Sequence, residues 1–179
     1  MLFKGGDLIW VLAIGKASYD AKLDLSMVAR AFGASNITFV SGKSGDNKKL
    51  MKYCEAMDKK WGGKFGVSFA DNWKEFISEK KNYLKVYLTR YGTPMKRHEY
   101  QINTYKNVLA IVSFTETIKQ LYKSADFNIS ITTQPHTCTS SVAIFLHNFY
   151  KGRELAMHFE NAAYKIEPEE HGVNVKRLR

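Results

Sequence analysis

Apolar runs of strand length alternate with segments of helical periodicity along most of this chain. Residues 8–14 form a continuous apolar run that predicts a buried strand. The segment after Gly15 ends at Gly33, and its apolar side chains recur at the spacing of one helical face, at Ala21, Leu25, Val28 and Phe32. This stretch therefore predicts a β-α unit.

The same alternation predicts five more strands, at residues 37–40, 65–69, 83–88, 108–112 and 127–131. A helix that ends at Gly62-Gly63 is indicated by apolar residues at helical spacing, namely Leu50, Tyr53, Cys54, Met57 and Trp61. A short helix that follows Asp71 is expected to use this residue as its N-cap. The last helix, capped by Thr139 or Ser140, is expected to bury Val142, Phe145, Leu146 and Phe149.

The carboxyl-terminal tail has two short strand-like segments, at residues 163–168 and 173–178, which predict a β-hairpin. The alternating strands and helices before it predict an α/β fold with a mostly parallel sheet and helices on both faces. No Pro/Gly/Ser-rich linker or change of composition interrupts the chain. We therefore expect a single domain over residues 1–179.

The chain carries 27 Lys and Arg residues against 17 Asp and Glu residues, a formal net charge of +10. A polyanion gains affinity for such a surface by releasing its counterions, so structured RNA is the expected class of partner. The alternative is a generic basic surface without a partner. A membrane surface is not expected, because no long amphipathic basic helix is visible.

The two cysteines, Cys54 and Cys138, form neither a disulfide framework nor a metal-ligand spacing. No metal is expected, and a reducing cytoplasm fits. The first residues lack the long apolar core of a signal peptide, and no apolar run approaches the ~20 residues that span a bilayer. A cytoplasmic location is the expectation.

Ligands of an open parallel sheet collect at the carboxyl ends of its strands, so the loops after Leu88, Val112 and Ile131 form the candidate site. None of these loops has a phosphate-cradling glycine pattern or a nucleophile elbow. Cys138 and His136 are two residues apart, which is too weak a pairing to predict a catalytic dyad. His136 alone fits a loop histidine whose ring bonds the backbone.

Six short segments, in order along the chain, resemble one protein family. They are VARAFGA at residues 28–34, WGGKF at 61–65, NW at 72–73, LTRYG at 88–92, ADFN at 125–128 and QPH at 134–136. Together they resemble the archaeal tRNA cytidine-56 2'-O-methyltransferases of the SPOUT superfamily, over residues 8–175. The resemblance implies a SPOUT-like fold with a carboxyl-terminal trefoil knot, a homodimer, a bent S-adenosylmethionine in the three loops, and methylation of a ribose 2'-hydroxyl in RNA.

The resemblance also implies a set of cofactor-binding positions, namely Leu88, Gly92, Ser113, Thr132, Gln134, Pro135 and His136. Three loops depart from the family pattern. The first loop, residues 15–22, lacks the family's catalytic arginine, Ser113 and then Phe114 begin the second loop in place of a glycine, and Thr132-Thr133 replace a Gly-Asn pair. A side chain in place of glycine can fill the space of a cofactor, and a β-branched residue is disfavoured at positive φ. We therefore expect a catalytically degenerate protein, not an enzyme, with no assigned catalytic residue and no cofactor expected.

The function expected to survive is RNA binding, as a structural component of a ribonucleoprotein such as the ribosome. Its partners would then be rRNA or tRNA and ribosomal proteins. Basic residues near the candidate site and at the carboxyl end are expected to contact phosphates. They are Lys16, Lys22, Lys43, Arg90, Lys96, Arg97, Lys176, Arg177 and Arg179.

Two alternatives stay open. One is an active S-adenosylmethionine-dependent tRNA (cytidine-56) ribose 2'-O-methyltransferase, which Gly92 and the QPH segment favour. The other is a small-molecule α/β enzyme with an incidental charge, for which the sequence offers no catalytic constellation. The apolar helix at residues 142–150 is the expected surface of a homodimer, whereas a scaffold held by RNA is expected to be monomeric.

Overall fold

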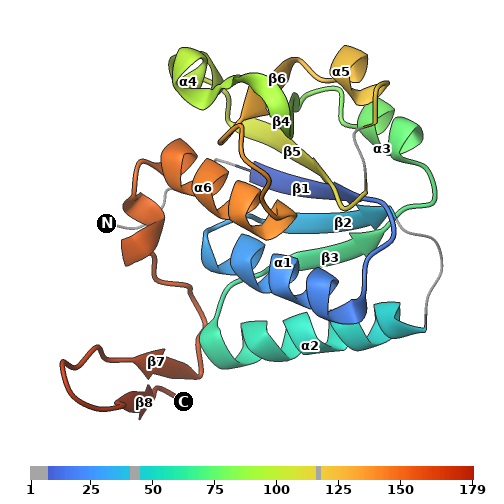
Figure 1. Ribbon diagram of the computed structural model, residues 1–179. Helices are drawn as coiled ribbons and strands as arrows, with labels where there is room; N and C mark the ends of the chain where they lie inside the picture. The colour runs from blue at the N-terminus through green and yellow to red at the C-terminus, as the bar shows by residue number, and fades with distance from the viewer. Residues whose placement is uncertain (1–7, 41–44, 116–117) are drawn as a thin grey trace.

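The computed structural model describes residues 8–40, 45–115 and 118–179, and its centre is a six-stranded sheet (Figure 1). The strand order is β3-β2-β1-β5-β4-β6, and every neighbouring pair is parallel. The strands are β1 (Leu8–Ile14), β2 (Asn36–Val40), β3 (Gly66–Phe69), β4 (Leu84–Pro94), β5 (Asn107–Ser113) and β6 (Phe127–Ser130). All six carboxyl ends therefore lie along one edge of the sheet.

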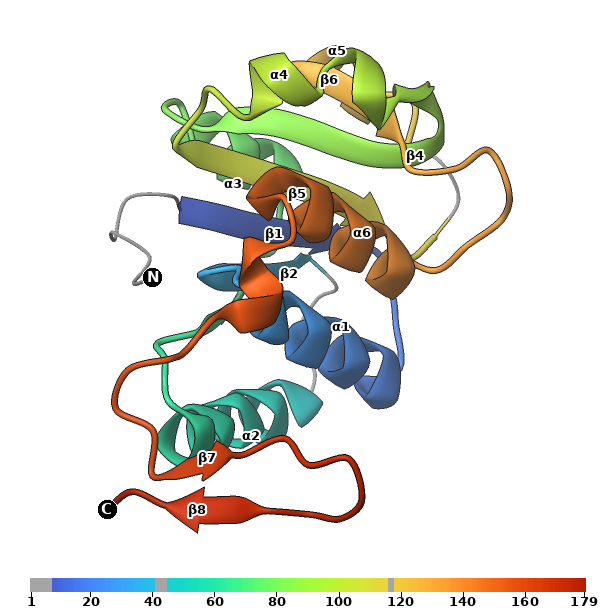
Figure 2. The same ribbon diagram turned by 90° about the vertical axis from the view of Figure 1, so that its left-hand side faces the viewer.

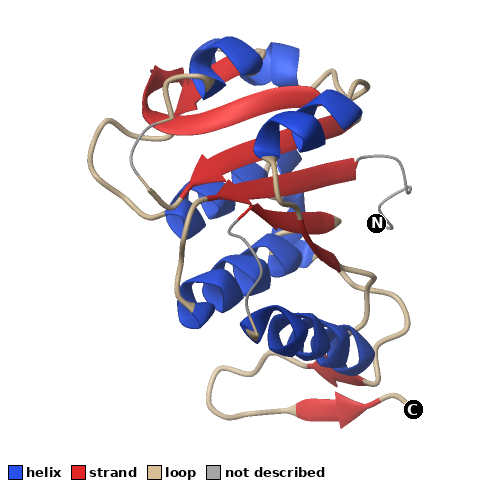
Figure 3. Ribbon diagram, turned by 90° about the vertical axis from the view of Figure 1, so that its right-hand side faces the viewer, coloured by secondary structure: helices blue, strands red, loops and turns tan. Residues whose placement is uncertain are grey.

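Helices cover both faces of this sheet (Figure 3). One face carries α1 (Tyr19–Ala31), α2 (Asp46–Trp61), α4 (Glu99–Ile102) and α6 (Cys138–Tyr150), with α1 packed beside α6. The other face carries α3 (Trp73–Glu79) and α5 (Leu121–Ser124). Two single-turn 3₁₀ helices, η1 (Met95–Arg97) and η2 (Arg153–Ala156), complete the set in the described ranges. The predicted α/β class, with a parallel sheet between two helical layers, is confirmed.

The alternation of side chains along each strand explains why helices pack on both faces of the sheet. In β1, Val11 and Ala13 face one core and Leu12 and Ile14 the other, because successive side chains of a strand point to opposite faces. Strand β5 divides in the same way, and its residues Val108–Val112 are at most 1% exposed. A strand buried on both faces is apolar at every position, which is why it reads as a continuous run.

The predicted carboxyl-terminal hairpin is present as β7 (Tyr164–Ile166) and β8 (Val175–Arg177), paired antiparallel. It lies against the end of α2, apart from the central sheet (Figure 2). The rings of Trp61 and Tyr164 make this contact, with centroids 6.4 Å apart. In the part of the chain that the structure describes, no helix is long and apolar enough to cross a membrane.

Several predicted details differ from the structure. Asn72, not Asp71, caps α3, because its side-chain oxygen accepts from the Lys74 amide at 2.9 Å. Thr137, not Thr139 or Ser140, caps α6 by accepting from the Ser140 amide. These shifts of one to three residues reflect the freedom of a chain to begin a helix at any of several adjacent polar residues.

The apolar residues of α6 lie inside the protein. Val142, Phe145 and Leu146 are fully buried and Phe149 is 5% exposed, so the prediction that this helix buries them is confirmed. The expectation that residues 142–150 form a dimer surface is wrong for these side chains, because α1 and the sheet already cover them. The homodimer, the single-domain organisation and the trefoil knot stay predictions.

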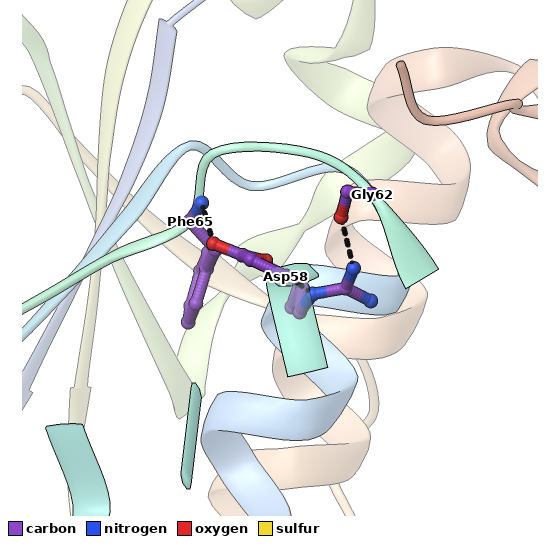
Figure 4. Close-up of polar contacts among 4 residues, drawn as sticks. Asp58, Gly62 and Phe65 are labelled. Atoms are coloured by element: carbon purple, nitrogen blue, oxygen red, sulfur yellow. Dashed lines mark hydrogen bonds and ion pairs between the residues drawn. The ribbon is translucent and has the colours of Figure 1, made fainter. Parts of the chain in front are cut away.

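A largely buried ion pair joins α1, α2 and the start of β3 (Figure 4). The Arg30 Nε donates to Asp58 Oδ1 at 2.7 Å, and a second guanidinium nitrogen donates to the Gly62 carbonyl. Asp58 Oδ2 accepts from the Phe65 amide at 2.7 Å. The Arg30 guanidinium also lies over the Phe159 ring at 5.0 Å, which ties the carboxyl-terminal segment to the same point. One carboxylate thus connects two helices and the turn between α2 and β3.

We expect Asp58→Ala to lower the free energy of unfolding by about 3 kcal/mol, because it leaves the Arg30 charge and the Phe65 amide without their partner. Urea unfolding followed by circular dichroism measures this loss. Glu55→Ala, an exposed site on the same helix, is the control and should change stability by no more than ~0.5 kcal/mol. A loss below ~1 kcal/mol for Asp58→Ala would contradict this account of the network.

Candidate functional site

The loops after β4, β5 and β6 meet the start of α6 at the carboxyl edge of the sheet and enclose a pocket. Its apolar wall consists of Tyr87, Leu88 and Val112. Its five serine and threonine residues are Thr89, Ser113, Thr115, Thr137 and Ser141. Arg90, His136 and Cys138 complete the lining. The three loops that the sequence indicates as the candidate site therefore come together.

The first of these loops is an interruption inside β4. Leu88 and Thr93 both pair with Ile129 of β6, so the four residues between them bulge out of the ladder. Gly92 closes the bulge against β6, where a Cβ atom would lie 2.5 Å from the Asn128 carbonyl oxygen. Glycine is required there by the approach of two backbones. The bulge sets Thr89 and Arg90 at the pocket.

The second loop does not place the Phe114 ring in the pocket. The Phe114 ring stacks on Phe39, with centroids 6.4 Å apart, and packs against the core beneath the sheet edge. The Ser113 hydroxyl bonds Thr115 within its own loop, at 3.2 Å between the two side-chain oxygens. The Phe114 ring therefore lies outside the pocket, because it gains more by burial against Phe39. Ser113, which stands in place of the family's glycine, does line the pocket.

The third loop is also free of the strain expected of it. Neither Thr132 nor Thr133 has a positive φ; among described non-glycine residues only Lys151 and Asn161 do. The two threonines that replace the family's Gly-Asn pair therefore adopt no left-handed backbone conformation and carry no strain of that kind. The His136 Nδ1 lies 2.8 Å from the Gln134 carbonyl oxygen and donates to it, which leaves Nε2 as an acceptor.

Cys138 does not form a dyad with His136. Its thiol donates to the Ser113 carbonyl oxygen at 3.1 Å, and burial raises the pKa of this thiol to about 11. The Cys54 thiol, packed in the core against α1, has a pKa raised to about 11 chiefly by the same desolvation. Both groups stay protonated at neutral pH, so neither acts as a nucleophile.

Only part of the predicted cofactor set lines the pocket. Leu88, Ser113 and His136 do, together with Arg90 from the predicted RNA-binding set. Four predicted positions lie outside this lining, namely Gly92, Thr132, Gln134 and Pro135. The sequence analysis missed several lining residues, namely Tyr87, Thr89, Val112, Thr115, Thr137, Cys138 and Ser141. Their shared signal is position at a strand end or at the first turn of α6, where hydroxyl groups cluster.

Most of the basic residues predicted to contact RNA are exposed, namely Lys16, Arg90, Lys96, Arg97, Lys176, Arg177 and Arg179. Lys22 differs, because it is only 5% exposed on α1 and offers little surface to a large ligand. Lys43 lies outside the described residues. Basic side chains are therefore exposed at Arg90 and on the hairpin. Their contacts with RNA stay predictions.

The two raised thiol pKa values predict slow alkylation of the folded protein. At pH 7.5 a thiol with a pKa of about 11 is ionised in roughly one molecule in three thousand, and the thiolate is the reactive form. Iodoacetamide should therefore label Cys54 and Cys138 at least ~100-fold more slowly than an ordinary thiol, with reactivity rising as the pH approaches 11. Mass spectrometry measures the labelling, and the urea-unfolded chain is the control. Rapid labelling of Cys138 at pH 7.5 would refute its assigned environment.

Comparison with known proteins gives the family. The family model for tRNA ribose 2'-O-methyltransferase, aTrm56, matches residues 61–176. A tRNA (cytidine(56)-2'-O)-methyltransferase of Methanobrevibacter smithii is 38% identical over 154 residues, 83% of each chain. The protein of the same name from Methanothermobacter thermautotrophicus is 33% identical over 174 residues, 94% of this chain and 96% of its own.

Solved structures agree on the fold. A putative RNA methyltransferase from Bacillus anthracis superposes with a TM-score of 0.63 at 16% identity, over 85% of this chain and 99% of its own. The SpoU methyltransferase AviRb from Streptomyces viridochromogenes, in complex with the cofactor AdoMet, superposes with a TM-score of 0.62 at 12% identity. The match covers 83% of this chain and 58% of the AviRb chain.

These comparisons correct two expectations. The departures of three loops from the family pattern predicted a protein that is not an enzyme and has no cofactor. The relatives that match most of this chain are, however, named methyltransferases. Two of the physical grounds for that expectation also fail, since Phe114 packs away from the pocket and Thr132 is unstrained, whereas the first loop has no arginine and Ser113 lines the pocket. Taken with the parallel sheet and the three-loop pocket, the matches show that this chain belongs to the family of archaeal tRNA ribose 2'-O-methyltransferases.

Proposed function

We propose that this protein is an active methyltransferase that uses S-adenosylmethionine to methylate a ribose 2'-hydroxyl of tRNA, at the cytidine named in its relatives. The observation that carries the proposal is the coincidence of two facts. Relatives named for this reaction match about 83–96% of their length. The three loops at the carboxyl edge meet in one pocket, where an open parallel sheet binds its ligands.

The pocket lining suits this cofactor chemically. Tyr87, Leu88 and Val112 offer an apolar wall for a nucleoside, and the five serine and threonine residues offer dipoles to a cationic ligand without a competing buried charge. Arg90 can pair with a carboxylate. When bound, S-adenosylmethionine supplies a methyl group on a positively charged sulfur.

The pocket is narrow in this structure. Its cavity measures about 70 Å³, well below the roughly 300–1,000 Å³ of typical small-molecule sites. Binding therefore requires the loops to separate. The residues that can move are the exposed ones of the third loop, Thr132 to Pro135, because Leu88 and Val112 are held in the sheet.

Two side chains can act on the tRNA ribose. The His136 Nε2 is an acceptor for the proton that the 2'-hydroxyl must lose, and none of the described lining residues is an Asp or Glu that could take it instead. The first loop has no arginine, and its exposed cation is Lys16. Arg90, exposed at the pocket, is the planar cation that can orient a ribose or phosphate group in its place.

The RNA partner of this proposal is tRNA. No finding supports a structural role in the ribosome or contact with ribosomal proteins, and neither is proposed. A homodimer remains compatible with the exposed residues of α6, such as Ile144, which is 45% exposed.

The test is methylation of unmodified archaeal tRNA by the purified protein, read by mass spectrometry of the nucleosides, together with calorimetric titration of S-adenosylmethionine. We expect 2'-O-methylcytidine and micromolar cofactor affinity. His136→Ala should lower the methylation rate about 100-fold, the size of a lost general base. His158→Ala, an exposed histidine outside the pocket, should leave the rate unchanged.

Absence of S-adenosylmethionine binding at millimolar concentration, with no methylated tRNA, would contradict the proposed activity. Equal rates for His136→Ala and the wild type, with methylation intact, would instead remove only the role of His136.

A further inference from the structure

A second pocket lies at the opposite edge of the sheet, at the amino ends of β4 and β6. Its cavity measures about 440 Å³, within the roughly 300–1,000 Å³ range of small-molecule sites. The lining residues that matter are Lys81, Tyr83, Lys85, Tyr105, Asp126 and Phe127. They come from three separate turns, before β4, before β5 and before β6. The usual site of an open parallel sheet is at the other edge, so the fold itself does not account for this pocket.

The composition of this pocket is that of a nucleotide site. Three aromatic rings, those of Tyr83, Tyr105 and Phe127, line it beside two lysines. Aromatic faces stack nucleic-acid bases, and lysines neutralise phosphates. The Tyr105 side chain is 48% exposed and Lys81 is exposed, so both are accessible to a ligand.

One wall of the pocket is already ordered. The Asp126 carboxylate accepts from the Lys85 amide at 2.8 Å, and the Asp126 amide donates to the Lys85 carbonyl at 2.9 Å. The Tyr83 ring packs edge-on against Trp10, with centroids 6.2 Å apart. The neighbouring Lys80 ammonium lies 3.3 Å from the centroid of one Trp10 ring and is engaged within the protein. The ligand-facing groups are therefore Lys81, Lys85 and Tyr105.

A basic and aromatic path connects this pocket to the first one. Parallel strands need a crossover, and the β4-to-β5 crossover runs from the carboxyl edge back to the amino edge through η1 and α4. Its exposed basic and aromatic residues are Lys96, Arg97, Tyr100, Tyr105 and Lys106, of which Tyr100 is 84% exposed, and the neutral Gln101 and Thr104 are exposed beside them. The two pockets also share β4, with Lys85 at one and Leu88 at the other, so these two residues are about 10 Å apart at the strand rise of about 3.3 Å per residue.

We propose that the amino-edge pocket binds an unpaired nucleotide of the tRNA, with the base against Tyr105 and the adjoining phosphate at Lys81 and Lys85. The identity of the RNA rests on the proposed function; the pocket as a nucleotide site rests on its own lining. A tRNA that presents one ribose at the carboxyl edge follows the exposed crossover to this second anchor.

Alanine variants with matched controls test the anchor. Tyr105→Ala should weaken tRNA binding about 5- to 100-fold, the range for loss of one base stack. Tyr53→Ala, a tyrosine 40% exposed on α2, should leave it unchanged. Lys81→Ala should lower the slope of log affinity against log salt by about one, and Lys52→Ala, exposed on α2, is its control.

Binding is measured by equilibrium filter binding of tRNA without S-adenosylmethionine, so that the result does not depend on methyl transfer. Thermal unfolding of each variant checks that it is folded, and cofactor affinity should equal that of the wild type. Ultraviolet crosslinking of 4-thiouridine-substituted tRNA should attach a nucleotide to the peptide that contains Tyr105.

Wild-type tRNA affinity for a folded Tyr105→Ala, together with no crosslink at the Tyr105 peptide of the wild-type protein, would overturn the anchor, whether or not the protein methylates tRNA. Loss of RNA affinity in that variant supports the anchor even if the wild type proves inactive, in which case only the proposed activity fails. Binding of an acidic peptide at this pocket with tRNA affinity unaffected by both variants would also overturn it.

Discussion

Parallel pairing of all six strands, with both faces of the sheet covered, is the constraint on which the rest of this structure depends. It forces each strand to return through a crossover, and it gathers all six carboxyl ends along one edge. The loops after β4, β5 and β6 are far apart in sequence, yet they meet because β4 lies between the other two strands. The Arg30–Asp58 pair stabilises the crossovers on one side of this arrangement by joining α1, α2 and β3.

The same constraint explains how the loops accept substitutions. Phe114 follows directly on a buried strand, so its ring has an apolar surface within reach and packs on Phe39 rather than in the pocket. Gly92 is held by the approach of the β4 bulge to the backbone of β6, whatever the cofactor. The Cys138 thiol donates a hydrogen bond to a backbone carbonyl of the adjacent loop. The pocket is thus lined by hydroxyl groups, one arginine, one histidine and one thiol beside an apolar wall.

Charge extends the site beyond its pocket. The basic residues are spread over α2, the turn before β4 and the crossover from β4 to β5, whereas the hairpin is close to neutral, because Glu167, Glu169 and Glu170 offset Lys165, Lys176 and Arg177. The hairpin even pairs Lys165 opposite Lys176, where like charges repel. The crossover matters most, because it links the two edges of the sheet with exposed lysine, arginine and tyrosine side chains.

The sequence by itself determined the fold class, the strands and their order along the chain, and the identity of the three loops. It did so because a doubly buried strand must be apolar at each position, as residues 8–14 and 108–112 are. The resemblance in six short segments also identified the family. Only the tertiary structure decided which loop residues line the pocket. Side-chain direction at a strand end depends on neighbours distant in sequence, such as Phe39 for Phe114, and the need for glycine at position 92 depends on the approach of the Asn128 backbone. The tertiary structure also brought Lys81, Tyr105 and Asp126 into one cavity, because the three turns that hold them lie side by side only when their strands are paired.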